Sequence, residues 1–111
     1  MSGILENYYN NKKIKTILGK DTNFNGNLSF KDSLKINGIF IGSINSSGVL
    51  VIGKGAIVQA NVTAKTVIIN GTIKGDVLAE EKVEMLPTGR VYGNIKAKKV
   101  KGTEVKQVLL H

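Results

Sequence analysis

The apolar positions of this chain fall into two series that repeat together along most of its length. In the first series a small residue lies between two apolar residues, each two places away, as in Phe24, Gly26 and Leu28. The small residues recur 16, 18, 15 and 18 positions apart, at Gly26, Gly42, Ala60, Gly75 and Gly93. The apolar residues before them are Phe24, Phe40, Val58, Ile73 and Val91, and those after them are Leu28, Ile44, Val62, Val77 and Ile95. Such self-similarity is typical of a repeat protein.

The second series consists of apolar pairs that follow the first series in every unit. Its members are Leu34 and Ile36, Leu50 and Ile52, Val67 and Ile69, and Val83 and Met85, with Val100 as a fifth position. They step by 16, 17, 16 and 17 residues, so both series share a mean period of about 17. Two independent series with the same mean period are hard to obtain by chance.

Within each unit the local period is two, as in the segments LKI, LVI, VII and VEM. Alternation of this kind is typical of a β-strand, whose successive side chains point to opposite faces. A unit of this length is too short for a strand and a packed helix, but it fits one coil of a parallel β-solenoid. We therefore predict an all-β, single-domain solenoid of about five to six coils. The period alone does not set the handedness of the coil.

Glycine and asparagine mark the predicted corners between strands. Asn37-Gly38 and Asn70-Gly71 each follow a strand, and both residue types tolerate positive φ. Pro87 lacks a backbone donor and is expected at a corner or an outer edge. No helical period follows any of the glycines, so the pattern favours turns over a phosphate-binding loop.

The repeat divides the 111 residues into two parts. Residues 16–111 form the predicted solenoid domain, and residues 1–15 lie outside the repeat. The segment Leu18-Gly19-Lys20 resembles Ile52-Gly53-Lys54 and predicts the last part of an earlier coil. At the other end, the spacing of Val105, Gln107 and Leu109 predicts a shortened sixth half-coil.

The N-terminal segment combines apolar and basic side chains. A short helix could gather the first group on one side, with lysines beyond it; the residues concerned are Ile4, Leu5, Tyr8, Tyr9, Lys12 and Lys13. This combination suits contact with an anionic membrane surface. A disordered tail is the alternative, favoured by the adjacent Asn10 and Asn11.

The two ends of the predicted solenoid carry no cap. Natural repeat proteins normally cover such ends, because each exposes an unpaired strand row above an apolar interior. We therefore expect end-to-end self-association into a homopolymer. The predicted interface residues are Ile17, Leu18, Phe24 and Leu28 at the N-terminal end and Val100, Val105, Leu109 and Leu110 at the C-terminal end.

The net charge of +8 is concentrated at the ends of the chain. Residues 21–89 sum to zero, whereas residues 1–20 sum to +3 and residues 90–111 to +5. Screening by salt, a lateral offset or a bound polyanion must then help if like ends meet. The run Lys96, Lys98, Lys99 and Lys101 leaves open an alternative function, a nucleic-acid-binding solenoid that bundles DNA. Lysines on an exposed strand also discourage misassembly, and Tyr92 is the only aromatic residue nearby.

Catalysis finds little support in the composition. The only histidine is the terminal residue and there is no cysteine, so we expect no catalytic dyad, no metal site and no cofactor. IGKGAI and VQANVT resemble two hexads of an acyltransferase repeat, but the phase is lost at the next hexad. Without an apolar run of membrane-spanning length or a signal peptide, we expect the chain in the cytoplasm.

Four segments carry a family resemblance: TILGKDTNFNGNL, INGIFIGSI, INGTIKGDV and GRVYGNIKAKKV. They resemble the bactofilins, polymer-forming cytoskeletal proteins of bacteria, from about Thr16 to Val108. The resemblance implies a right-handed parallel β-helix. It also implies filaments that form without nucleotide, often apolar ones joined head to head and tail to tail, commonly at the inner face of the membrane. Such filaments can localise cell-wall synthases or peptidoglycan hydrolases and so influence cell shape.

The chain departs from the family pattern near its C-terminus. Bactofilins usually have a phenylalanine in the last coil that is important for polymer contacts, and Val105 takes the equivalent place here. Val105, Leu109 and Leu110 then supply a smaller apolar surface. A short membrane-contacting N-terminal segment is common in the family. This strengthens the interpretation that residues 1–15 contact a membrane surface.

Overall fold

In a computed structural model, residues 16–102 are described, and they form eleven strands and no helix. The strands are β1 (Thr16–Leu18), β2 (Asn23–Phe30), β3 (Leu34–Ile36), β4 (Ile39–Ser46), β5 (Val49–Ile52), β6 (Ile57–Ile69), β7 (Thr72–Lys74), β8 (Val77–Met85), β9 (Arg90–Tyr92), β10 (Ile95–Lys96) and β11 (Lys99–Gly102). Every recorded pairing between them is parallel. The predicted all-β fold is confirmed.

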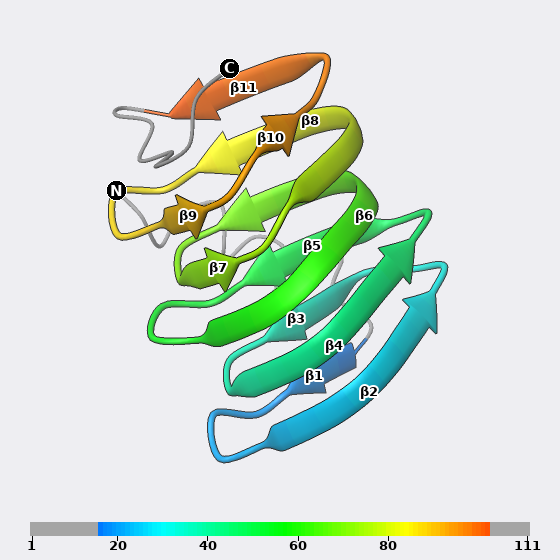
Figure 1. The fold of residues 1–111 in the computed structure, drawn as a ribbon, viewed down its shortest axis with the longest axis vertical. Coiled ribbons are helices and arrows are strands. Elements are labelled where there is room, and N and C mark those ends of the chain that lie inside the picture. The colour runs from blue at the N-terminus through cyan, green and yellow to red at the C-terminus, as the bar shows by residue number, and fades with distance from the viewer. Residues whose placement is uncertain (1–15, 103–111) are drawn as a thin grey trace.

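The strands wind into a solenoid, with each strand paired to its equivalents in neighbouring coils (Figure 1). Each coil has three straight sides. In the fourth coil the first side is β7, Thr72–Lys74, and the second and third sides are the first and last parts of β8. In Figure 1, β2 and β4 run from left to right in front, and β3 and β5 return from right to left behind them. Because the chain climbs as it turns in this sense, the coil is right-handed, as the family resemblance implies.

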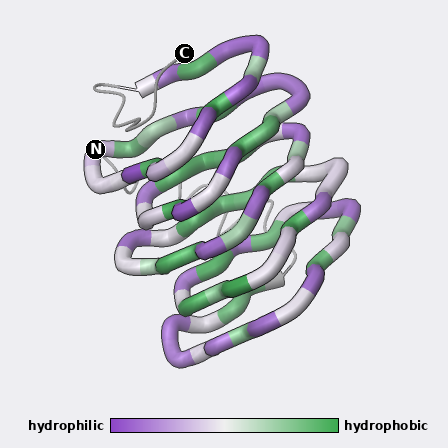
Figure 2. The backbone as a smooth tube through the Cα atoms, viewed as in Figure 1, coloured by the Kyte–Doolittle hydropathy of each residue, from purple (hydrophilic) through white to green (hydrophobic). Residues whose placement is uncertain are grey.

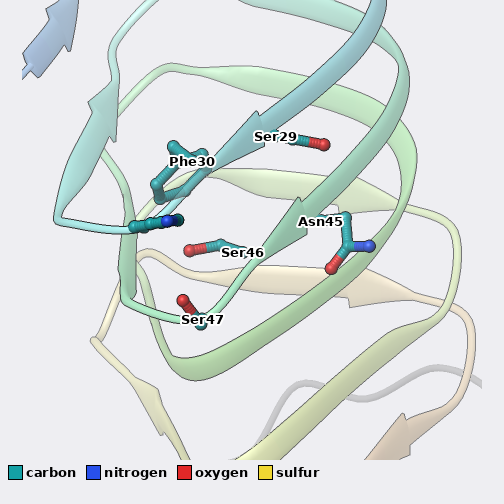
Figure 3. Close-up of a pocket in the computed structure, with 6 residues that line it drawn as sticks. Ser29, Phe30, Asn45, Ser46 and Ser47 are labelled. Atoms are coloured by element: carbon teal, nitrogen blue, oxygen red, sulfur yellow. The ribbon is translucent and has the colours of Figure 1, made fainter.

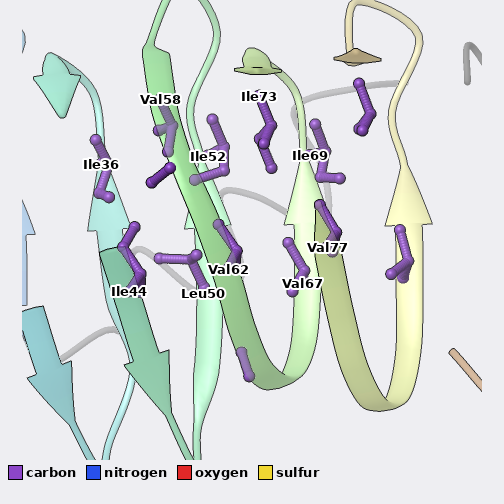
Figure 4. Close-up of a cluster of buried hydrophobic side chains, with 14 of the residues drawn as sticks. Ile36, Ile44, Leu50, Ile52, Val58, Val62, Val67, Ile69, Ile73 and Val77 are labelled. Carbon is purple, nitrogen blue, oxygen red and sulfur yellow. The ribbon is translucent and has the colours of Figure 1, made fainter. Parts of the chain in front are cut away.

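The register confirms both predicted apolar series. On the first side of the coils, Phe24 pairs with Phe40, Phe40 with Val58, Val58 with Ile73, and Ile73 with Val91. On the third side the same holds for Leu34, Leu50, Val67, Val83 and Val100. Figure 4 shows side chains of both series filling the space between the two layers of strands. The hydrophobic core is therefore one continuous column, and the bends between strands carry many of the hydrophilic residues (Figure 2).

A further interior stack lies at the corner between the second and third sides. Phe30 pairs with Ser46, and Ala64 pairs with Ala79 in the coils above. Apart from Phe30, the residues of this stack are small, and Ala64 and Ala79 are buried. This stack does not belong to either of the two predicted apolar series.

The uneven spacing of the small residues has a simple cause. In alternate coils a four-residue turn closes the corner before the first side, with hydrogen bonds from Thr22 N to Gly19 O, Ala56 N to Gly53 O, and Gly89 N to Leu86 O. In the other coils the same corner has only two residues, Asn37-Gly38 or Asn70-Gly71. The distance between successive small residues therefore alternates between a longer and a shorter value. Pro87 is the second residue of its turn, a position that its fixed φ favours, so its predicted placement at a corner is confirmed.

Polar side chains also link the coils on the outside. Ser43 Oγ donates to Asn27 Oδ1 at 2.6 Å, Asp76 N donates to Asn61 Oδ1 at 3.1 Å, and Asn94 N donates to Asp76 Oδ1 at 3.1 Å. These bonds join one coil to the next, because equivalent residues stack directly above one another.

Candidate functional site: the two open ends of the solenoid

The N-terminal end of the solenoid exposes unpaired strand edges. Within residues 16–102, β1 pairs with β3 alone and β2 pairs with β4 alone. The opposite edge of each strand therefore presents backbone N–H and C=O groups that no described strand satisfies. Such an edge is a template for pairing with another chain.

Apolar side chains lie directly above the core at this end. Leu18, Phe24, Leu28 and Phe30 are half-buried and pack against the buried cluster. The Phe24 and Phe40 rings stack with centroids 5.1 Å apart and an interplanar angle of 7°. A hollow of about 250 Å³ opens beside Leu18, Leu28, Phe30 and Leu34. The interior column is therefore incompletely covered at this end.

Ile17 differs from the other three predicted interface residues of this end. It pairs with Lys35, whose neighbours Leu34 and Ile36 point inward, so Ile17 lies on the outside of the coil. Its side chain is 49% exposed. The structure thus brings Leu18, Phe24 and Leu28 together at the end of the column and places Ile17 on the flank.

Phe30 is an end residue that the sequence analysis missed. It belongs to the NFNGNLSF alternation, in which every second residue points inward. Figure 3 shows Phe30 beside Ser46 of the next coil, at a hollow of about 350 Å³ that Ser29, Asn45 and Ser47 also line. Continuing the period of two from Leu28 by one more step would have identified it.

The C-terminal end of the described chain is equally open. Within residues 16–102, β9 pairs with β7 alone, and both β10 and β11 pair with β8. Val100 occupies an inward position above Val83, yet it is 42% exposed because no described coil follows it. Ile95 and Ala97 are half-buried against the core. The predicted interface residues Val105, Leu109 and Leu110 lie outside the described residues.

The four lysines of the last coil follow the chain around a corner. Lys96 pairs with Leu78 on the second side of the coil, whereas Lys99 and Lys101 pair with Lys82 and Glu84 on the third side. Lys98 lies at the corner between them, beside a hollow that Glu81 also lines. These cations therefore do not form one straight row on a single face.

Two ion pairs lie on the solvated surface of the described chain. Lys65 lies 3.8 Å from Glu81 and Lys82 lies 3.4 Å from Glu84, and all four side chains retain solvent contact. Exposed pairs of this kind contribute little to stability. Among residues 16–102, no three His, Cys, Asp or Glu side chains gather where a metal ion could bind.

The predicted membrane-contact residues lie outside the described part of the chain. They are Ile4, Leu5, Tyr8, Tyr9, Lys12 and Lys13. Within the described part there is no helix long and apolar enough to cross a membrane.

Fold and ends together define a class: a parallel β-solenoid repeat protein whose apolar column and strand ladders are open at both ends of the described residues, 16–102. A family model described as "Bactofilin: Polymer-forming cytoskeletal" matches residues 16–107. The chain therefore belongs to the bactofilin family, and the predicted resemblance is confirmed.

Two curated relatives come from Myxococcus xanthus (strain DK1622). Bactofilin BacP is 32% identical over 85 residues, which cover 77% of this chain and 35% of BacP. Bactofilin BacO is 31% identical over 85 residues, which cover 77% of this chain and 68% of BacO. The match thus spans about a third of BacP and about two thirds of BacO. No solved structure gives a significant match.

Proposed function

We propose that this chain assembles end to end into filaments without nucleotide, by continuing the solenoid from one subunit into the next. The observation that carries the proposal is the openness of both ends, where apolar interior side chains and unpaired strand edges lie together. The family description, polymer-forming and cytoskeletal, supports self-association.

Two effects would drive the formation of such a junction: the burial of apolar side chains and the pairing of open strand edges. Leu18, Phe24, Leu28 and Phe30 are each only half-buried in one chain. Full burial of an apolar side chain contributes roughly 1.5–3 kcal/mol, and the open edges gain backbone partners at the same time. The junction therefore needs no hydrolysis of a ligand to form.

Introducing a charge at an interior position of each end tests this assembly. We expect Leu28→Lys at the N-terminal end and Val100→Lys at the C-terminal end to remove filaments from negative-stain electron micrographs. A lysine at a closed junction would bury an unpaired charge, which is strongly unfavourable. Leu78→Lys is the matched control, because Leu78 is 45% exposed on the flank of the coil.

The size of the products also reveals how the subunits are joined. If like ends meet, either single variant should stop at dimers in sedimentation experiments, and the double variant should be a monomer. If unlike ends meet, either single variant should already be a monomer. Far-UV circular dichroism should show unchanged β-structure in all variants. Folded variants of both ends that still form normal filaments would disprove the proposal.

We further propose that the filament lies at the inner face of the cytoplasmic membrane and acts as a scaffold for cell-wall synthases or peptidoglycan hydrolases. The apolar and basic residues of segment 1–15 support the membrane part. The scaffold role, with its effect on cell shape, rests on the family resemblance.

A further inference from the structure

An apolar stripe lies on the outside of the third side of the coils. Val51 and Ile68 pair with each other in adjacent coils, and their chain neighbours point into the core. Both side chains must therefore point outward. They form a cluster separate from the core, flanked by Val49 and Leu86. We call Val49, Val51, Ile68 and Leu86 the outer apolar stripe.

The stripe is outward-facing but not exposed. Val51 and Ile68 both have 0% of their surface accessible in a single chain. Lys35, which occupies the same outward position one coil below Val51, is only 4% exposed. A flat strand layer cannot hide its own outer side chains to this extent, because each has neighbours in the sheet plane but none above it.

A matched comparison comes from the same strand. Ile57 and Ile68 are both outward-facing isoleucines of β6, each with a coil below and a coil above it. Ile57 is 37% exposed, as an uncovered outer position should be, whereas Ile68 is fully buried. This difference in exposed fraction indicates that something covers the third side and does not cover the first side.

We propose that this cover is the chain's own N-terminal segment, residues 1–15. Strand β1 begins at Thr16 and is the first strand of this same layer, followed by β3 and β5 (Figure 1). Segment 1–15 is therefore joined to the fold at the edge of the layer that carries the stripe, two strands away from Val51. Fifteen residues can span about 50 Å, whereas the stripe crosses only a few strand spacings of about 4.8 Å.

The composition of the segment fits the stripe. Ile4, Leu5, Tyr8 and Tyr9 supply apolar side chains at close spacing. The other terminal segment, residues 103–111, is shorter, and its spacing predicts a continuation of the coil at the open end. Segment 1–15 has no such place in the repeat, so its apolar side chains are available for the flank.

The same side chains are proposed to contact the membrane, and they cannot be buried in both places at once. Docking on the outer apolar stripe and insertion into a lipid surface are then mutually exclusive states of one segment. The docking proposal itself does not depend on the membrane proposal.

Thiol labelling tests the docking directly, because the natural chain has no cysteine. A water-soluble maleimide is reacted with Ile68→Cys in the full chain and in a chain that lacks residues 1–13. We expect labelling at least about tenfold slower in the full chain, since a covered thiol reacts only after local opening. Ile57→Cys should react fast in both backgrounds, and the inward Val67→Cys should stay protected in both if the coil remains folded.

Three outcomes would overturn the proposal. Fast labelling of Ile68→Cys in the full chain would mean that nothing covers the stripe in solution. If Ile68→Cys is equally protected with and without residues 1–13, and the protection is lost on deletion of residues 103–111, the cover is the other terminus. Protection that disappears on dilution would assign it to a second copy. Protection that is independent of concentration and lost with residues 1–13 would support the proposal.

Discussion

Single residues decide how closely the coils can approach at the bend between the first and second sides. Gly42 has φ of +142°, and a Cβ added there would collide with the backbone oxygen of Gly26 directly below it. Gly75 and Gly93 repeat this arrangement in later coils, with the oxygen of the preceding coil in the way each time. Glycine is therefore required by both backbone conformation and close approach.

We predict that Gly42→Ala lowers the free energy of unfolding by about 2 kcal/mol or more, because both the backbone angle and the adjacent coil oppose a Cβ. Thermal unfolding followed by circular dichroism measures the change. Gly19→Ala is the matched control, because its nearest contact would be Thr22 Oγ1 at 3.9 Å and its φ is not positive. An equal loss in both variants would contradict the argument from the bend.

At the scale of the element, each strand is stabilised by the strands directly below and above it. Phe40 of β4 lies between Phe24 and Val58 and is fully buried, while Ile41 beside it points outward and is partly exposed. Successive side chains of β4 thus point alternately into the core and toward the surface. In a solenoid, loss of one inward side chain weakens two interfaces between coils, because each coil contacts only its neighbours.

Phe40→Ala should cost about 3–5 kcal/mol, the usual cost of removing a buried aromatic ring. Urea denaturation followed by circular dichroism measures it. Ile41→Ala, in the same strand but outward, should cost well under half as much. A similar cost for the two substitutions would mean that the strand does not alternate as described.

At the scale of the whole molecule, the chain presents two kinds of surface for assembly. The ends are open in the direction of the solenoid axis, whereas the outer apolar stripe lies on the flank. Filament growth and docking of segment 1–15 therefore use different surfaces and need not compete. Membrane contact competes with docking alone, because both use Ile4, Leu5, Tyr8 and Tyr9.

Deletion of residues 1–13 should release the protein from vesicles that contain phosphatidylglycerol and leave filaments intact, because the end surfaces remain. Co-sedimentation with the vesicles measures binding. Replacement of both Ile4 and Leu5 by Ser should reproduce the release, and Asn10→Ser should not. In the full chain, the same vesicles should raise the labelling rate of Ile68→Cys. Equal vesicle binding with and without residues 1–13 would rule out the segment as the anchor.

Much of the fold could be predicted from local periodicity. Inward residues such as Phe40 and Leu50 stack on their equivalents because strand alternation and a coil of nearly constant length act over short stretches of chain. Phe30 was missed because its partners in the corner stack are small and do not stand out as apolar.

The sequence by itself determined the coil period, the register and the residues of the core, because these depend on side-chain alternation along single strands. The tertiary structure alone decided what happens outside the coil. In LVI and VII the repeat assigns the first and third residues to the core, but it does not explain why the outward Val51 and Ile68 are apolar and buried as well. The burial of Val51 and Ile68 and the outward placement of Ile17 follow from how the coils are arranged in three dimensions, which alternation along a single strand does not encode.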